Sequence, residues 1–196
     1  MIETTTLTLV GDGEDPLIVH NGLLADREYE WTKAMAPLTS KRKKTDDDHL
    51  AIAALEWRGS LYYDEELGPY LPGDNVRRCL LDAARLTKEG KNIERGVLAV
   101  SRRNPLIYDG PRDPEVMWKD PRFVHRAIVK VSTSKVVRTR PKFVGWSAQV
   151  EVSYDSEVIE GRDLLRIAIS AGRFIGIGDG RPFYGGRFNI LEAADQ

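Results

Sequence analysis

The clearest pattern of hydrophobic and polar positions is a strict alternation between Trp146 and Tyr154. Every second residue of this stretch is apolar, and the residues between them are Ser, Gln, Glu and Ser. A period of two predicts a β-strand with one buried and one solvent-facing side. Residues 4–10 are β-branched and alternate in the same way before the Gly11-Asp12-Gly13 turn, which predicts a first strand.

Four stretches show helical features, three of them with apolar residues spaced three and four apart, as in amphipathic helices. They cover residues 24–37, a segment that Asp46 is expected to cap, residues 74–88 and residues 161–172. Pro37 is expected to end the first helix, because proline disrupts a helix interior. Further strands are predicted at about 60–63, 95–101, 123–137 and 187–191.

The order of these elements predicts the fold class. Without residues 11–60 and 101–122, the chain runs strand, helix, strand, strand, helix, strand. This order is typical of an α+β fold with a ferredoxin-like, RNA-recognition-type βαββαβ core, which leaves one sheet face open for a partner. We expect a single domain over residues 1–196, with residues 11–60 as a mainly helical insertion and the Pro-rich residues 101–122 as an arm or loop.

Composition narrows the class of protein. The 196 residues are 41% hydrophobic and 30% charged, with a formal net charge of −1, which excludes a disordered or collagen-like chain. The sequence has no apolar run of about 18 residues, so no membrane span is expected. Cys79 is the only cysteine, so an intrachain disulfide is impossible, and a reducing cytoplasmic location fits best.

Charge is unevenly distributed along the chain. Residues 121–150 contain seven basic and no acidic residues, and phosphate binding needs such a surface. The alternative is a solvated strand face whose lysines protect a sheet edge from pairing. The candidate nucleic-acid contacts in this segment are Lys130, Lys135, Arg138, Arg140 and Lys142.

A Gly-rich loop covers residues 176–186 and holds five glycines. Glycines let the backbone approach an anion closely, and neighbouring aromatic rings can stack on unpaired bases. The loop follows a helix and precedes a strand, which is the reverse of a dinucleotide-binding context, and a tight helix-to-strand connection is the alternative. The candidate contacts here are Gly176, Gly178, Arg181, Phe183, Tyr184 and Arg187.

Catalytic signals are weak. His20, His49 and His125 are far apart and have no metal-binding spacing, and the chain has neither a GxSxG motif nor a P-loop. Cys79 lies on the apolar face of a predicted helix, where a buried, inert thiol is expected. We therefore expect no catalytic residue, no metal and no cofactor, and favour a non-enzymatic role.

Two stretches together resemble a known family. Residues 69–80 (PYLPGDNVRRCL) resemble the entry into the first helix of the CRISPR-associated repeat-associated mysterious protein (RAMP) superfamily, and residues 176–188 resemble its C-terminal Gly-rich loop. The whole chain is also similar to a group of phage and prophage proteins, through residues 42–48 and 107–114. The resemblance implies a modified RNA-recognition fold that binds along an RNA strand, with the Gly-rich loop near the backbone.

Two functions follow as hypotheses. The first is a non-catalytic protein that binds single-stranded nucleic acid, RNA rather than DNA, and that assembles head-to-tail along the strand as a homo-oligomer or as part of a CRISPR-like complex. The alternative is a phage protein-interaction module that uses residues 101–122 to engage or mimic a CRISPR or other host complex. The near-zero net charge favours the alternative slightly.

Overall fold

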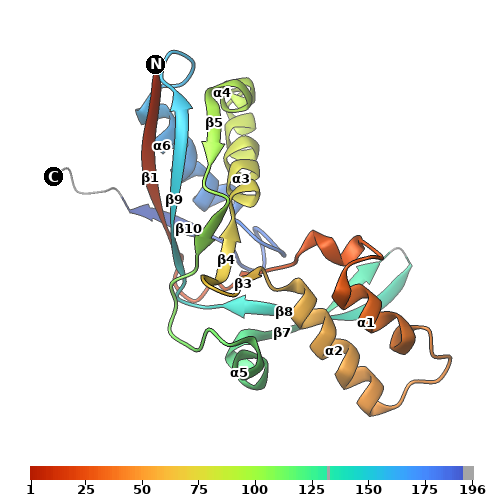
Figure 1. Ribbon diagram of the computed structural model, residues 1–196. Coiled ribbons are helices and arrows are strands. Elements are labelled where there is room, and N and C mark those ends of the chain that lie inside the picture. The colour runs from red at the N-terminus through yellow and green to blue at the C-terminus, as the bar shows by residue number, and fades with distance from the viewer. Residues whose placement is uncertain (132, 192–196) are drawn as a thin grey trace. The chain divides into compact units, whose positions relative to one another are not determined.

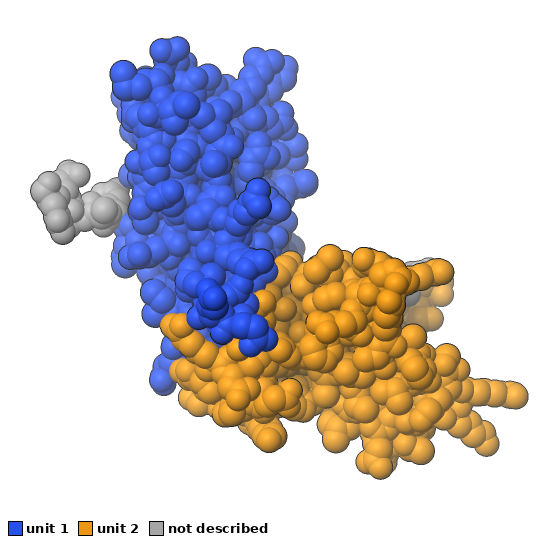
Figure 2. All heavy atoms as spheres, viewed as in Figure 1, with its two compact units in different colours: residues 1–17, 64–109, 144–196 blue, residues 18–63, 110–143 orange. Residues whose placement is uncertain are grey.

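The computed structural model describes residues 1–131 and 133–191. It has an α+β fold with 39% helix and 30% strand in antiparallel sheets. The chain divides into two compact units, coloured separately in Figure 2. Unit 1 contains residues 1–17, 64–109 and 144–196, and unit 2 contains residues 18–63 and 110–143. Each unit is therefore built from separate pieces of the chain.

A four-stranded sheet forms the centre of unit 1. Its order is β10-β1-β9-β5, and every neighbouring pair is antiparallel. Figure 1 shows β1 and β9 running side by side. The strands are β1 (Ile2–Gly11), β5 (Val97–Val100), β9 (Ser147–Asp155) and β10 (Phe188–Leu191). The alternation predicted around residue 150 is thus confirmed as a central strand.

The two faces of this sheet differ in chemistry. Leu7, Val150 and Val152 are buried on one face, where α3 (Gly73–Leu86) and α6 (Gly161–Ser170) contribute to the core. On the other face Thr4 pairs with Ser153 and Thr8 with Gln149. Among the described residues, the outward positions of β1 and β9 carry hydroxyl, amide, carboxylate and aliphatic groups and no cation or aromatic ring. This face is therefore unsuited to base stacking.

Unit 1 also holds smaller elements around the first motif of the RAMP resemblance. A three-stranded sheet has the order β3-β4-β6, with β4 (Gly68–Pro72) and β6 (Arg103–Pro105) in unit 1 and β3 (Tyr63–Asp64) where the chain passes from unit 2 to unit 1. Residues 68–72, at the start of this motif, form a strand. Helix α3 ends at Leu86, and Gly90 begins a second, short helix, α4 (Gly90–Gly96).

Unit 2 packs helices against a β-hairpin. Strands β7 (Val124–Val131) and β8 (Ser134–Phe143) form the hairpin, and β2 (Leu17–Ile18) lies beside β8. The helices are η1 (Gly22–Ala25), α1 (Glu30–Thr39), α2 (Asp46–Ser60), α5 (Pro114–Lys119) and η2 (Pro121–Phe123). The core includes Trp57, whose Nε1 donates to the Phe123 carbonyl at 2.9 Å, together with buried Met117 and Phe143.

The end of α1 and the cap of α2 differ from the sequence predictions. Pro37 lies inside α1 and does not end it, because a proline removes only one backbone donor and the helix runs just two residues further. Helix α2 is capped by Thr45, not by Asp46. The Thr45 side chain accepts from the Asp48 amide while the Asp48 carboxylate accepts from the Thr45 amide, which is a capping box.

The two segments expected as additions to a single core contain regular structure of their own. Residues 11–60 hold β2, η1, α1 and α2. Residues 101–122 hold β6 and α5 and bury Leu106 and Met117. Within the described part of the chain, no helix combines the length and apolar character needed to cross a bilayer.

Candidate nucleic-acid interface

The eleven candidate contacts from the sequence fall into two groups, one on each unit. Lys130, Lys135, Arg138, Arg140 and Lys142 lie on the hairpin of unit 2. Gly176, Gly178, Arg181, Phe183, Tyr184 and Arg187 lie between η3 (Ala171–Ile175) and β10 of unit 1.

The strand register divides the basic residues of the hairpin between its two faces. Directly opposite residues of an antiparallel pair project to the same side. Lys130 pairs with Lys135, Ile128 with Val137, and Arg126 with Thr139, so these residues share one face. Near the hairpin end this face is exposed: Ile128 is 71% and Val137 52% accessible. We call Arg126, Ile128, Lys130, Lys135 and Val137 the hairpin face.

Arg138 and Arg140 project to the opposite side of the hairpin, toward α1 and α2. Arg138 Nη1 lies 2.9 Å from Oε1 of buried Glu56, and the Thr139 amide donates to Glu56 Oε2 at 2.9 Å. Glu56 thus neutralises Arg138 and anchors β8 to α2. Lys142 has the same parity as Arg138 and Arg140 in β8 and is half-buried. The acid-free segment therefore does not form one basic surface.

Burial changes the titration of the groups on this inner side. Burial lowers the pKa of His20, and the nearby Arg140 guanidinium lowers it further. Burial also lowers the pKa of Arg140, while the Glu56 carboxylate raises it and Arg138 lowers it to a smaller extent. Both groups therefore lie among charges of opposite sign, and for both of them burial has the largest effect on the pKa.

The Gly-rich loop is fixed by backbone hydrogen bonds. The Ile177 amide donates to the Gly186 carbonyl at 2.7 Å, and the Gly186 amide donates to the Pro16 carbonyl at 2.9 Å. Gly186 has φ of 81°, and a Cβ there would lie 2.0 Å from the Ile177 carbonyl oxygen. Only glycine fits this position without rearrangement. The loop therefore has a defined conformation.

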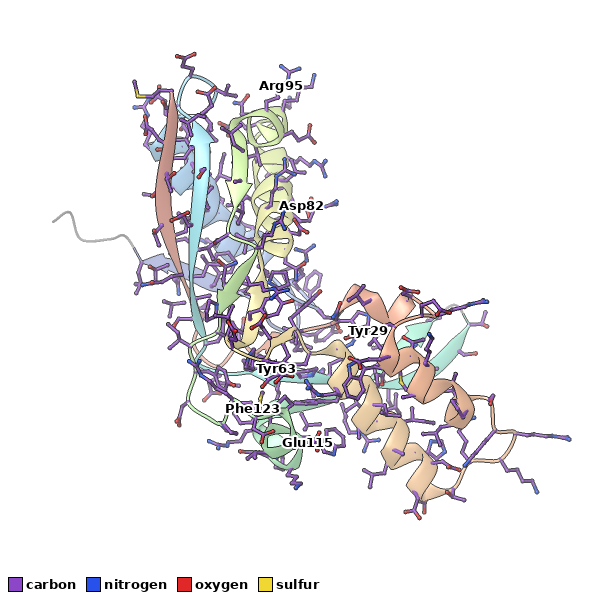
Figure 3. All side chains as sticks on the ribbon, viewed as in Figure 1. Tyr29, Tyr63, Asp82, Arg95, Glu115 and Phe123 are labelled. Carbon is purple, nitrogen blue, oxygen red and sulfur yellow. The ribbon has the colours of Figure 1, made fainter. Side chains whose placement is uncertain are left out.

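Arg181 braces the loop from inside. Its guanidinium donates to the Gly176 carbonyl at 3.4 Å and lies 3.7 Å from Asp82 of α3, the residue labelled in Figure 3. The Gly176 carbonyl also accepts from Cys79 Sγ at 3.1 Å. The prediction that Gly176 and Arg181 meet an anion stays untested, but both already have partners within unit 1.

Two aromatic residues on this loop are exposed. Phe183 is 84% and Tyr184 76% accessible, and the Tyr184 amide donates to the Gly180 carbonyl at 2.9 Å. Exposed rings next to each other on a well-fixed loop are unusual for residues that normally bury most of their surface. Both side chains are therefore available to a partner.

Cations lie close to this loop in sequence and in space. Arg173 and Arg187 line one open pocket of about 510 Å³, together with Asp12 and Asn189. The Arg173 guanidinium also lies 5.3 Å from the Phe174 ring centroid. The sequence analysis did not include Arg173 and Phe174 among the candidate contacts. The available signal was a cation and an aromatic residue directly after the last predicted helix.

Sequence reasoning also assigned no role to Arg126. The signal was present as a short alternation of Arg126, Ile128 and Lys130, which places a cation, an aliphatic side chain and a cation on one strand face.

Among the residues that the structure describes, no three His, Cys, Asp or Glu side chains gather closely enough to hold a metal ion. Burial raises the pKa of the Cys79 thiol to about 12, so this cysteine is protonated at neutral pH.

No protein-family model and no curated protein matches the sequence.

Proposed function

We propose that this protein binds single-stranded nucleic acid without catalysing a reaction on it, and that Phe183 and Tyr184 stack on unpaired bases. The exposure of these two rings on a fixed loop carries the proposal. A base stacked on an aromatic ring contributes about 1–3 kcal/mol, and every base offers a π-face, so such binding tolerates any sequence. Single strands are the fitting substrate because duplex bases are already stacked.

Cations supply the second part of the interaction. Arg173 and Arg187 provide positive charge on unit 1. On unit 2, the hairpin face offers three cations around an exposed aliphatic pair. Phosphate contacts release counterions, so each one adds about −0.7 to the slope of log K against log salt for a single strand. Arg138 is left out of this surface because Glu56 neutralises it.

We further propose that the core of unit 1 is ferredoxin-like. The elements β1, α3, β5, β9, α6 and β10 follow the βαββαβ order, and the sheet order β10-β1-β9-β5 supports this proposal. The outward sheet face lacks rings and cations among the described residues of β1 and β9. In our proposal the strand therefore contacts the Gly-rich loop and not the sheet face.

A relationship to the RAMP superfamily remains part of the proposal. Cys79 belongs to the first stretch that carries the resemblance and Gly176 to the second, and the two residues are in contact. This contact between the two motifs supports a common origin of this chain and the RAMP superfamily. RNA is accordingly the expected strand.

The experiment is fluorescence anisotropy with labelled 20-nucleotide single-stranded RNA, single-stranded DNA and duplex DNA. The Phe183→Ala/Tyr184→Ala variant should bind single strands at least about tenfold more weakly, since each stacked ring accounts for 1 kcal/mol or more. Tyr184→Phe should bind like wild type because it keeps the ring. Leu86→Ala removes an exposed apolar side chain, 60% accessible, from α3 and serves as the control.

A charge series tests the hairpin face separately. The Arg126→Gln/Lys130→Gln/Lys135→Gln variant should reduce the salt slope by about 2 in magnitude. The control is Arg27→Gln/Lys91→Gln/Arg95→Gln, which removes the same charge from other exposed positions. Equal effects of the two triple variants would argue against a hairpin contact. Folded wild-type protein that binds none of the three nucleic acids would overturn the proposed function.

A further inference from the structure

Unit 2 has a small open pocket lined by indole rings. Its volume is about 100 Å³, and its rings come from three helices: Trp31 from α1, Trp57 from α2 and Trp118 from α5. The ring centroids of Trp57 and Trp118 lie 5.9 Å apart. Trp57 is buried, whereas Trp31 and Trp118 are half-buried. An aromatic lining of this kind favours a flat ring or a cation as the ligand.

Two side chains of opposite charge complete the lining. Arg58 of α2 and Glu115 of α5 both line the pocket, and Glu115, labelled in Figure 3, is exposed. The Arg58 guanidinium lies 5.2 Å from the ring centroid of Trp31 and 4.8 Å from that of Tyr63. Within residues 1–131 and 133–191, neither Arg58 nor Glu115 forms an ion pair. The pocket therefore offers N–H donors and a carboxylate acceptor.

The size of the pocket limits the ligand to one ring. A closed cavity of about 150 Å³ holds benzene, so an open pocket of about 100 Å³ suits a single six-membered ring that stays partly in solvent. Sites for a whole small molecule typically measure about 300–1,000 Å³. A ligand in this pocket is therefore one ring of a larger molecule, and the two fused rings of a purine fit less well.

The balance of charge selects against an ammonium ligand. Pockets lined by aromatic rings often bind quaternary ammonium groups. Here Arg58 already places a cation over the Trp31 ring, and a second cation beside it would be repelled. An uncharged ring with both donors and acceptors on its edge satisfies Glu115 and Arg58 together.

We propose that this pocket binds the base of an unpaired pyrimidine nucleotide against Trp31 and Trp118, with Glu115 accepting from the edge of the base and Arg58 donating to it. Cytosine offers an amine beside a ring nitrogen, and uracil offers an N–H between two carbonyl oxygens, so each has a donor and an acceptor. The inference rests on the proposed function for the strand that carries the base. It adds a preference for pyrimidines, which stacking on the Gly-rich loop does not provide.

NMR of the indole N–H groups tests the pocket without a strand. Cytidine and uridine should cause saturable shifts of the Trp31 and Trp118 signals and leave the signal of Trp146, which lies in unit 1, unchanged. Adenosine and choline should bind at least about tenfold more weakly. Absence of shifts with both pyrimidine nucleosides would overturn the inference. Adenosine or choline that binds as tightly as cytidine would also overturn it.

Anisotropy with 20-nucleotide oligouridine and oligoadenosine tests the pocket on a strand. Glu115→Ala should weaken oligouridine binding about tenfold and change oligoadenosine binding much less, because it removes an acceptor that only the pyrimidine reaches. Trp118→Ala should weaken oligouridine binding at least about fivefold. Glu28→Ala removes an exposed carboxylate from the same unit and should leave both affinities unchanged.

The outcomes separate this inference from the proposed function. If Glu115→Ala weakens binding of both strands equally, or of neither, the pyrimidine pocket is overturned while binding of single strands stands. If uridine shifts the two indole signals but wild type binds no strand, the proposed function fails while the pocket remains a pyrimidine site. Glu115 is exposed, so Glu115→Ala keeps the test decisive even if Trp118→Ala does not fold.

Discussion

Lys130 and Lys135 are direct cross-strand partners near the end of the β7–β8 hairpin. Like charges in this position repel, because the Cβ atoms of directly opposite residues lie about 4.5–5.5 Å apart. An anion that bridges the two lysines would relieve this repulsion.

Lys135→Glu should therefore have opposite effects on folding and on binding. Replacing a like-charge pair with an opposite-charge pair should stabilise the protein by about 0.5 kcal/mol. The same change should weaken binding of single-stranded nucleic acid, since one phosphate contact is lost. Urea unfolding and anisotropy measure the two effects.

The matched control is Lys91→Glu, which makes the same charge change at an exposed position of α4. It should change the free energy of unfolding and the affinity for single-stranded nucleic acid less than Lys135→Glu does. A Lys135→Glu protein that binds as tightly as wild type would remove the hairpin face from the proposed interface.

The Gly-rich loop yields a prediction about stability. Gly186→Ala should destabilise the protein by more than about 2 kcal/mol, because it adds a Cβ 2.0 Å from the Ile177 carbonyl oxygen to the strain of positive φ. Gly13→Ala is the control. Its φ is 57°, and a Cβ there would meet nothing within 4 Å, so it should lose only about 1 kcal/mol. Equal losses in urea unfolding would show that the loop is not held as described.

The histidines of unit 2 predict a pH dependence. Burial lowers the pKa of both His20 and His125 below the ordinary value of 6.5. The unfolded chain then binds protons more readily than the folded one, so stability falls as pH decreases from about 7 to 5. Arg138, Arg140 and Glu56 face His20, and the two arginines lower its pKa while Glu56 raises it.

Urea unfolding at pH 7, 6 and 5 measures this slope. The His20→Gln/His125→Gln variant carries no titrating imidazole at these two positions and should show a smaller loss of stability over the same range. An unchanged slope in the double variant would contradict the assignment.

Cys79 should be unreactive in the native protein. Its thiol is buried, donates to the Gly176 carbonyl, and has its pKa raised to about 12. A thiol reagent at pH 8 should modify one cysteine per chain in denaturant and react natively only at the rate of unfolding. Because the folded pKa is the higher one, stability should also fall as pH rises above about 9. Rapid native labelling would show that the contact between α3 and the Gly-rich loop opens.

Much of the fold could be predicted from periodicity, because burial imposes it. The strand at Ser147–Asp155 and the helices at Gly73–Leu86 and Gly161–Ser170 lie close to where the pattern placed them. Each buries one regular face in the core of unit 1. The expected α+β class is confirmed.

Features that depend on distant contacts could not be predicted. The hairpin was expected as one strand over 123–137, because its sequence has no Gly, Pro, Asn or Asp to mark a turn between Val131 and Ser134. Without that turn, the pairing register of β7 and β8 could not be predicted. The sequence therefore did not show that Lys130 and Lys135 lie on the face opposite Arg138 and Arg140. Glu56 lies 82 residues before Arg138, so no local pattern could reveal their pairing.

The side-chain positions in the Gly-rich loop could also be predicted only in part. Exposed rings at Phe183 and Tyr184 agree with their position outside any periodic segment. The inward role of Arg181 depends on Asp82, which comes from a helix about a hundred residues earlier in the chain.

The chain passes between the two units four times, near residues 17, 63, 109 and 143. Neither unit is continuous, so the pieces of unit 2 are joined through unit 1. Pairing of Val10 with Ser147 brings together the crossings near residues 17 and 143. Pairing of Tyr70 with Pro105 does the same for the crossings near residues 63 and 109. These pairings lower the loop-closure entropy that unit 2 must overcome to assemble. A chain cut at residue 109 would leave each unit without a part of its own core, so neither half of this protein is a domain by itself.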